Sequence, residues 1–374
     1  MPAPLNRRSF LKQAASTAAG IAATGAIPAS LAVGTQTSTA RAAERSARPA
    51  SDQRTLTIIC WQGYTDPSFV KPFEQMNNCK VVATYAGSSD EMVAKWIAGH
   101  GNTYDLVSAS GDADRRFINS RTLLEIDVTK LKNFEQLYPK FHTPVWNTRN
   151  GVHYGVSFTW GPNTLIYDTR VFKQTPTSWH VLYDPAYKKK LSAYDSAITI
   201  ADVALYLGWK DCYNLDDAKL AKIKSVLAAQ KPLLLKYWAS TGDVEDAFHH
   251  GELVASSAWP LMTNDLRKTK FPIGETIPKE GATGWADTWM ISKNSPNVDL
   301  AMKWIDYMIG TQGQLGVINV TGYAGASRTA ASALGQARVK ALHMDDFNYF
   351  DQLHIWSEPA NYAAWTKVWN DVRG

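Results

Sequence analysis

The chain has 374 residues, which is long for a single hydrophobic core and sufficient for two lobes. Its 39 lysine and arginine residues outnumber its 34 aspartate and glutamate residues by five, but four of the basic residues and no acidic residue lie in residues 1–42. The rest of the chain therefore carries 35 basic and 34 acidic residues, a balance that excludes nucleic-acid binding by bulk positive charge.

Residues 1–42 have the pattern of a twin-arginine export signal. Arg7 and Arg8 precede a weakly apolar, alanine-rich run over residues 14–33, and a small-residue cleavage pattern ends the segment. A disordered alanine-rich tail is the alternative, but the three features occur in the order that export requires. Residues 43–53 are predicted to be a flexible tether. No later run reaches the ~18 apolar residues of a membrane span, so we expect a soluble mature protein.

The first part of the mature chain alternates strand and helix patterns. Apolar runs at 55–60, 81–85 and 104–108 lack polar alternation, which is typical of buried strands in a parallel sheet. Each run leads through a short loop into a helical pattern, the first beginning near Asp66-Pro67. This order predicts an α/β lobe.

Polar and aromatic residues follow two of these strands. Trp61 and Tyr64 follow the first strand, and Ser110 and Asp112 follow the third. Because ligands of open α/β sheets bind beyond the carboxyl ends of strands, these side chains are candidates for a site. The glycine-rich phosphate turn of a dinucleotide fold is missing here, since only Gly63 lies between Trp61 and Tyr64.

The three cysteines do not form a disulfide framework. Cys60 ends one predicted strand and Cys79 begins the next parallel strand, which places them at opposite ends of the sheet and beyond disulfide reach. We therefore expect Cys60, Cys79 and Cys212 to be small apolar residues.

The second half of the chain predicts another lobe. Residues 165–167 form a predicted strand, and residues 253–259 form one that ends in Trp259. Further expected helices cover residues 195–207 and 218–229, one opens at 295–296 with Trp304 on its apolar face, and a closing helix is expected within 344–369. No period of 20–50 residues recurs, which excludes a solenoid.

Residues 281–290 contain an indole and a carboxylate at strand spacing. Trp285 and Asp287 are two residues apart, so an extended backbone points both to one side, and Gly281 and Gly284 allow close backbone approach. An indole face with a nearby carboxylate suits a small organic cation. A core tryptophan beside a capping aspartate is the alternative for this stretch alone.

The sequence lacks the motifs of catalysis and metal binding that we searched for. The sequence has no His-Glu-x-x-His motif, no paired cysteine spacing and no Gly-x-Ser-x-Gly elbow, and the adjacent His249 and His250 would point apart on a helix. We expect no enzyme activity, no metal and no cofactor. A secreted enzyme remains the competing class.

Nine separate pieces of the chain together resemble one protein family. They are Trp61-x-x-Tyr64, Tyr104-Asp105-Leu106-Val107 before Ser110, Trp160-Gly161, Ser178-Trp179, Gly251-Glu252, Trp259, Pro278-Lys279-Glu280-Gly281, Trp285-x-Asp287 and Gly322-Tyr323. In order and spacing they resemble the polyamine-binding (spermidine/putrescine) branch of the periplasmic substrate-binding proteins of ABC transporters. The resemblance runs from about Thr55 to the end of the chain.

The resemblance implies a type II periplasmic-binding-protein fold of two α/β lobes, each a mainly parallel sheet flanked by helices. Lobe 1 would comprise residues 54–160 and 286–330, and lobe 2 residues 161–285 and 331–374. It also implies a monomer in the periplasm that takes a small cationic amine and delivers it to an ABC permease in the inner membrane. A sensor that hands the amine to a receptor is the alternative within the binding class.

Carried over by position, the resemblance assigns an aromatic box and a central carboxylate. The box would consist of Trp61, Tyr64, Trp259, Trp285 and Tyr323, with Asp287 as the carboxylate and Ser110 as a polar contact.

Relatives usually carry a second carboxylate about three residues after an acid near Asp195, and here that position is Ile198. Asp112 occupies a place where relatives tend to have an aromatic residue. The ligand is therefore expected to be a shorter diamine, a monoamine or a quaternary amine, unless Asp112 or Asp195 supplies the second charge.

Overall fold

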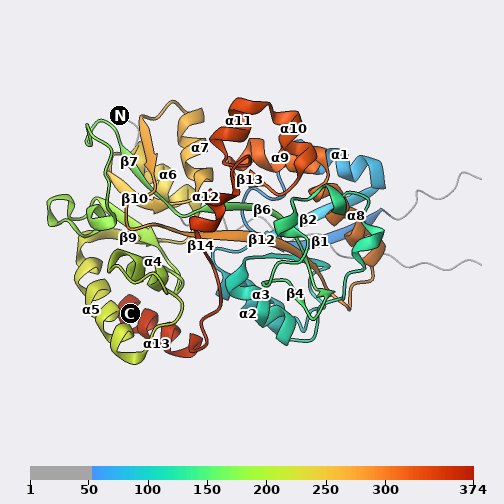
Figure 1. Ribbon diagram of the computed structural model, residues 1–374, viewed down its shortest axis with the longest axis horizontal. Coiled ribbons are helices and arrows are strands. Elements are labelled where there is room, and N and C mark those ends of the chain that lie inside the picture. The colour runs from blue at the N-terminus through green and yellow to red at the C-terminus, as the bar shows by residue number, and fades with distance from the viewer. Residues whose placement is uncertain (1–52) are drawn as a thin grey trace, which may run out of the picture. The chain divides into compact units, whose positions relative to one another are not determined.

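The computed structural model describes residues 53–374 (Figure 1). The predicted export signal at 1–42 and nearly all of the predicted tether at 43–53 lie outside the described residues. Within residues 53–374, no helix is long and apolar enough to cross a membrane.

The first sheet has seven strands in the order β13-β6-β12-β3-β1-β2, with β14 paired to β12. Its strands are β1 (Arg54–Cys60), β2 (Cys79–Tyr85), β3 (Leu106–Ala109), β6 (Val156–Pro162), β12 (Thr283–Ile291), β13 (Ala324–Gly325) and β14 (His354–Ile355). β1 runs parallel to β2 and β3, as the alternating pattern predicts. β12 runs antiparallel to both β3 and β6.

The second sheet has five strands in the order β11-β7-β10-β8-β9. They are β7 (Thr164–Asp168), β8 (Leu191–Tyr194), β9 (Leu234–Trp238), β10 (Ala255–Ala258) and β11 (Ile273–Thr276). β8 is parallel to its neighbours β9 and β10, whereas β7 is antiparallel to β10 and β11. A separate small hairpin pairs β4 (Thr148–Arg149) with β5 (Val152–His153).

Both sheets are thus mixed, and the expectation of mainly parallel sheets is wrong in this detail, although the α/β class is confirmed. Two strands that form antiparallel pairs, β7 and β12, enter their sheet from the other sheet. β6 leads directly into β7, and β12 arrives after β11; both β6 and β12 run between the two groups of strands in Figure 1. Apolar patterning reveals that such a segment is a buried strand but does not reveal its direction.

Helices flank both sheets. One group of helices comes after β1, β2, β3, β12 or β13 in the chain. It consists of α1 (Pro67–Asn77), α2 (Ser89–Ala98), α3 (Gly111–Asn119), α8 (Val298–Ile309), α9 (Thr311–Thr321), α10 (Arg328–Leu334), α11 (Gln336–Ala341) and α12 (Phe347–Gln352). The remaining ones are α4 (Thr199–Tyr206), α5 (Asp217–Gln230), α6 (Thr241–His249), α7 (Pro260–Lys268) and α13 (Tyr362–Arg373). Short 3₁₀ helices cover Val128–Lys130, Phe134–Gln136, Pro139–Phe141, Trp179–Tyr183, Pro185–Tyr187 and Lys231–Leu233.

Local sequence explains where α1 begins and why the tail is broken. Asp66 caps α1 by accepting from the Ser68 backbone N–H, and Pro67 occupies the first helical position, as predicted. The single closing helix expected within 344–369 is wrong: α12 and α13 are separated by β14 and a loop containing Pro359. A proline disfavours helical backbone in the preceding residue, which separates the two helices.

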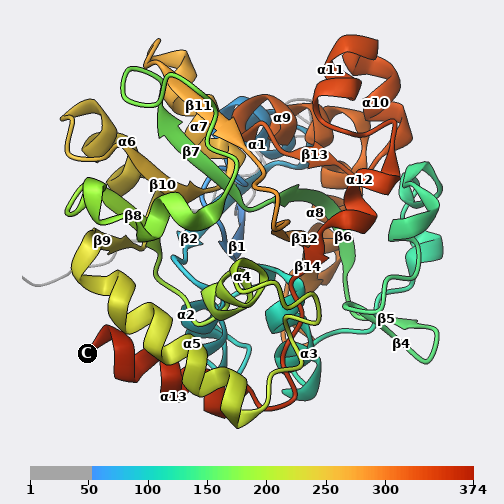
Figure 2. The same ribbon diagram turned by 60° about the vertical axis from the view of Figure 1, so that its left-hand side comes forward.

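Two buried clusters hold the described chain together. The larger cluster spans both sheets and includes Trp304, which is fully buried and lies edge-to-face with Phe73 and Trp289, as its helical spacing predicts. The smaller cluster joins α4, α5 and α13 around Trp365. Figure 2 shows α13 lying along α5.

All three cysteines are buried and free, as expected. In the β1–β2 register, Arg54 pairs with Cys79 and Cys60 pairs with Tyr85, so Cys60 and Cys79 lie at opposite ends of the strands.

The division into lobes by residue range stays a prediction. Chain segments pass between the sheets after β6, before β12 and after β14. β14 pairs with β12 of the first sheet, whereas α13 packs against α5.

The contact between α8 and α9 provides a test of the packing. A Cβ on Gly313 of α9 would lie 2.3 Å from the Tyr307 backbone oxygen, so Gly313→Ala must displace backbone. We expect it to lower the free energy of unfolding by about 1–3 kcal/mol. Gly242 of α6 has nothing within 4 Å of such a Cβ, so Gly242→Ala is the matched control and should be neutral or stabilising by up to ~1 kcal/mol. Denaturant unfolding measures both; equal stability of the two variants would contradict the packing.

Candidate binding site

A small cavity lies among residues that are far apart in the sequence. Its lining residues are Trp61, Tyr64, Ser110, Trp259, Trp285, Asp287, Tyr323 and Trp356. Six of these eight residues carry aromatic rings, and among these described lining residues Asp287 is the one carboxylate. Neither lysine nor arginine is among them. The chemistry of the cavity wall is that of an aromatic box with a single negative group.

Part of the cavity wall is positioned by the ends of strands in the first sheet and by the start of the helix that follows one of them. Trp61 and Tyr64 lie in the loop after β1, and Ser110 is the N-cap residue of α3 directly after β3. Because β1 and β3 are parallel neighbours, their carboxyl ends meet at one edge, where the sequence places these candidates.

The indole and the carboxylate of β12 do share one face. Trp285 and Asp287 both line the cavity, as the two-residue spacing predicts. A Cβ on Gly161 of the paired strand β6 would lie 2.8 Å from Trp285 Cζ2. Only glycine at this position lets the indole lie against the backbone of β6.

Asp287 is held by two hydroxyl groups in a nearly dry setting. Asp287 is 3% exposed. Tyr64 Oη donates a hydrogen bond to Asp287 Oδ2, and Ser110 Oγ donates one to Asp287 Oδ1. Burial raises the pKa of Asp287 to about 7, while the two hydrogen bonds act in the opposite direction by stabilising the ionised form. A cation in the cavity would stabilise that ionised form further.

Edge-to-face contacts fix the rings around the carboxylate. The centroids of Trp61 and Trp259 are 5.8 Å apart at 73°, and those of Trp285 and Tyr323 are 4.4 Å apart at 64°. Tyr64 and Tyr323 meet at 6.2 Å and 86°. Such contacts stabilise aromatic pairs and restrict their rotation. The wall is therefore preorganised.

Trp356 is the lining residue that sequence reasoning missed. It lies between β14 and α13, where a continuous helix was expected. Its backbone N–H donates to the Gly284 oxygen at 2.7 Å and its Nε1 to Thr283 Oγ1 at 3.1 Å, while its ring stacks parallel to Tyr194. The aromatic residues of the tail indicated that it could contribute a ring to the site. Trp356 could be identified only by knowing that the helix is broken at this point.

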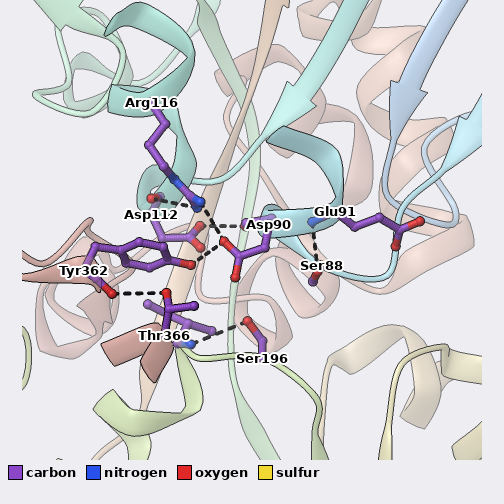
Figure 3. A network of polar contacts seen from close by, with 10 residues as sticks. Ser88, Asp90, Glu91, Asp112, Arg116, Ser196, Tyr362 and Thr366 are labelled. Atoms are coloured by element: carbon purple, nitrogen blue, oxygen red, sulfur yellow. Dashed lines mark hydrogen bonds and ion pairs between the residues drawn. The ribbon is translucent and has the colours of Figure 1, made fainter. Parts of the chain in front are cut away.

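Asp112 does not line the cavity. It lies in a polar network that joins α2, α3 and α13 (Figure 3). Ser89 Oγ donates to Asp112 Oδ1 at 2.9 Å, and Arg116 pairs with Asp90 at 2.6 Å. The hydroxyl of Tyr362 donates to the same Asp90 carboxylate. Burial raises the pKa of Asp112 to about 7.

Asp195 also lies outside the cavity. Its Oδ2 accepts from Arg373 at 2.8 Å, near the end of α13. Ile198, in the place of an expected second carboxylate, is buried at the start of α4. The structure therefore brings together seven of the nine predicted residues and leaves out the two acidic ones that were candidates for a second charge.

Comparisons with known proteins show the family of the chain. The model of the family described as bacterial extracellular solute-binding protein matches residues 68–344. A spermidine/putrescine-binding periplasmic protein of Salmonella typhimurium is 28% identical over 305 residues, covering 80% of this chain and 86% of the relative. A putrescine/cadaverine-binding protein of Pseudomonas aeruginosa is 25% identical over 307 residues, covering 77% of this chain and 83% of the relative.

A solved structure shares the fold. It is a Listeria monocytogenes protein named as a spermidine/putrescine ABC transporter, with a TM-score of 0.77 and 22% identity, covering 86% of this chain and 99% of that one. Since the family model spans most of the chain, from α1 to the end of α11, the chain belongs to the bacterial extracellular solute-binding proteins.

Proposed function

We propose that this protein is the periplasmic substrate-binding component of an ABC transporter and captures a polyamine or a related small organic cation. The names of the similar relatives support an amine ligand and transport. Binding without chemistry fits their description as binding proteins.

One observation carries the proposal: the buried Asp287 carboxylate faces a cavity whose other walls are mostly aromatic rings. A cation over an aromatic face gains about 1–2 kcal/mol in a desolvated setting. Several rings and one charge pair can reach the roughly 8 kcal/mol that a micromolar site requires. A neutral or anionic ligand would leave the carboxylate without a partner of opposite charge.

A ligand bound in the cavity would contact residues that follow strands of both sheets. Trp61 follows β1 of the first sheet, and Trp259 follows β10 of the second. Near them, Thr241 Oγ1 donates to Gln62 Oε1 at 2.9 Å, and Tyr194 Oη donates to the Gly87 oxygen at 3.0 Å. A ligand that touches both sides favours the arrangement in which these contacts exist. The closed protein would then dock on a membrane permease.

Removal of the charge on Asp287 tests the site. Asp287→Asn should weaken binding of an amine by about 2–4 kcal/mol, because the ammonium loses its partner of opposite charge. Isothermal titration of the mature protein with butylamine, putrescine, spermidine and choline measures the loss.

Asp195→Asn is the matched control, since Asp195 pairs with Arg373 outside the cavity. We expect its affinity to stay within about threefold of wild type. Unchanged binding by Asp287→Asn, or an equal loss in both variants, would refute the role of Asp287.

The pKa of Asp287 predicts how binding depends on pH. A cation binds the ionised carboxylate, so affinity should rise with pH up to about 7 and level off above it. Below that pH, protonation should weaken binding by about tenfold per unit. Choline is a suitable probe because its quaternary nitrogen does not titrate.

Asp112 also has a pKa raised to about 7, so Asp287→Asn must be measured in parallel. Tyr64 and Tyr323 have pKa values raised well above the usual value by burial and stay protonated in this range. If the Asp287→Asn variant keeps the wild-type slope, the pH dependence belongs to another group.

Export by the twin-arginine route is part of the proposal, with the paired arginines of residues 1–42 as its support. Replacing Arg7 and Arg8 together by lysine should leave the full-length precursor in the cytoplasm. Cell fractionation and the mass of the processed chain measure this. Normal periplasmic processing of the double variant would argue for a different route.

A further inference from the structure

A buried chain of hydrogen bonds lies behind two tryptophans of the cavity wall. Trp356 Nε1 donates to Thr283 Oγ1 at 3.1 Å, and Trp259 Nε1 donates to Asn163 Oδ1 at 3.1 Å. Asn163 Nδ2 in turn donates to Thr283 Oγ1 at 2.5 Å. Thr283 Oγ1 donates its own proton to Asp202 Oδ1, at 2.6 Å.

Thr283 is the centre of this network, and its hydroxyl is fully used. It accepts two hydrogen bonds and donates one, which is the full capacity of a hydroxyl group. Thr283 is fully buried on β12, two residues before Trp285. The network therefore fixes the indole N–H groups of both Trp259 and Trp356 to one anchored point.

Asp202 is the carboxylate nearest to this wall in the network, yet it does not line the cavity. It borders a separate small cavity with Trp179, Tyr183 and Gln230. Burial raises the pKa of Asp202 to about 6, so the carboxylate is mostly ionised at neutral pH. Its charge is satisfied by Thr283 and lies behind the tryptophans.

We propose that Thr283, Asn163 and Asp202 are positioning residues that hold Trp259 and Trp356 as a selective wall, so that the site accepts a cation with one charged nitrogen and discriminates against diamines and polyamines. This inference rests on the proposed function and narrows its ligand class. Asp287 is the one carboxylate among the described lining residues, and the wall separates the cavity from Asp202.

The physical basis is the uncompensated second charge. One ammonium of a diamine can pair with Asp287, but the other would face aromatic rings in an enclosed space, where an unpaired charge is strongly disfavoured. A zwitterion is disfavoured as well, because no lysine or arginine is among the described lining residues to pair with its carboxylate.

Butylamine and putrescine have the same four-carbon chain and differ by one ammonium group. A preference between these two ligands therefore reports on charge and not on chain length.

Titration of the mature protein with butylamine and putrescine tests the inference directly. We expect butylamine or choline to bind at least tenfold more tightly than putrescine and spermidine, with betaine weakest. Tighter binding of putrescine than of butylamine would overturn the inference and leave the proposed function intact. Binding of none of these amines would overturn both.

Variants of the wall provide a second readout, the ratio of the two affinities. Trp356→Ala opens the cavity toward Thr283 and Asp202, so the preference for butylamine over putrescine should fall at least tenfold. Trp356→Phe and Thr283→Val keep most of the packing and remove one partner each from the network, and each should lower the same ratio by a smaller factor.

Trp209→Ala is the matched control, because Trp209 is partly buried and packs against the separate cluster of α4, α5 and α13. It should leave the affinity ratio unchanged. Because both ligands are measured on the same folded sample, a general loss of stability does not move the ratio. A ratio that stays at the wild-type value in Trp356→Phe, Thr283→Val and Trp356→Ala would refute the positioning role.

Discussion

The geometry of the cavity depends on one carboxylate that lies where water is nearly excluded. Asp287 resides on a central strand of the first sheet, and its burial alone would favour the neutral acid. Tyr64 and Ser110 oppose this by donating to both carboxylate oxygens. Each donor lies at the carboxyl end of a strand next to β12 or near it, so the sheet itself provides the counterbalance.

The aromatic residues then divide into two groups with different roles. Trp304 and Trp289 fill the interior, and the lining tryptophans surround the carboxylate. Two of the lining indoles are tied by hydrogen bonds to Asn163 and Thr283. Rings that are held in this way would need little reordering if a ligand bound between them, so less of its binding free energy would be lost to conformational entropy.

Much of this was accessible from sequence because it depends on local pattern. Apolar runs predicted the strands, and strand spacing predicted that Trp285 and Asp287 share a face. The failures are long-range. Whether Asp112 faces the cavity depends on how α3 packs against Ser89 of α2. Asp195 forms an ion pair with Arg373, which is close to the C-terminus. Trp356 lines the cavity because the strand before it, β14, pairs with β12.

The polar network of Asp90, Arg116 and Tyr362 bears on the affinity for a ligand. Tyr362 opens the last helix, which lies along α5, while Asp90 and Arg116 belong to helices that follow β2 and β3. Drawing these two sides apart would leave the carboxylate and the guanidinium without the phenol that touches both. If the two sides separate in the empty protein, the apparent dissociation constant of a ligand would include the free energy of these contacts, none of which involves a residue that lines the cavity.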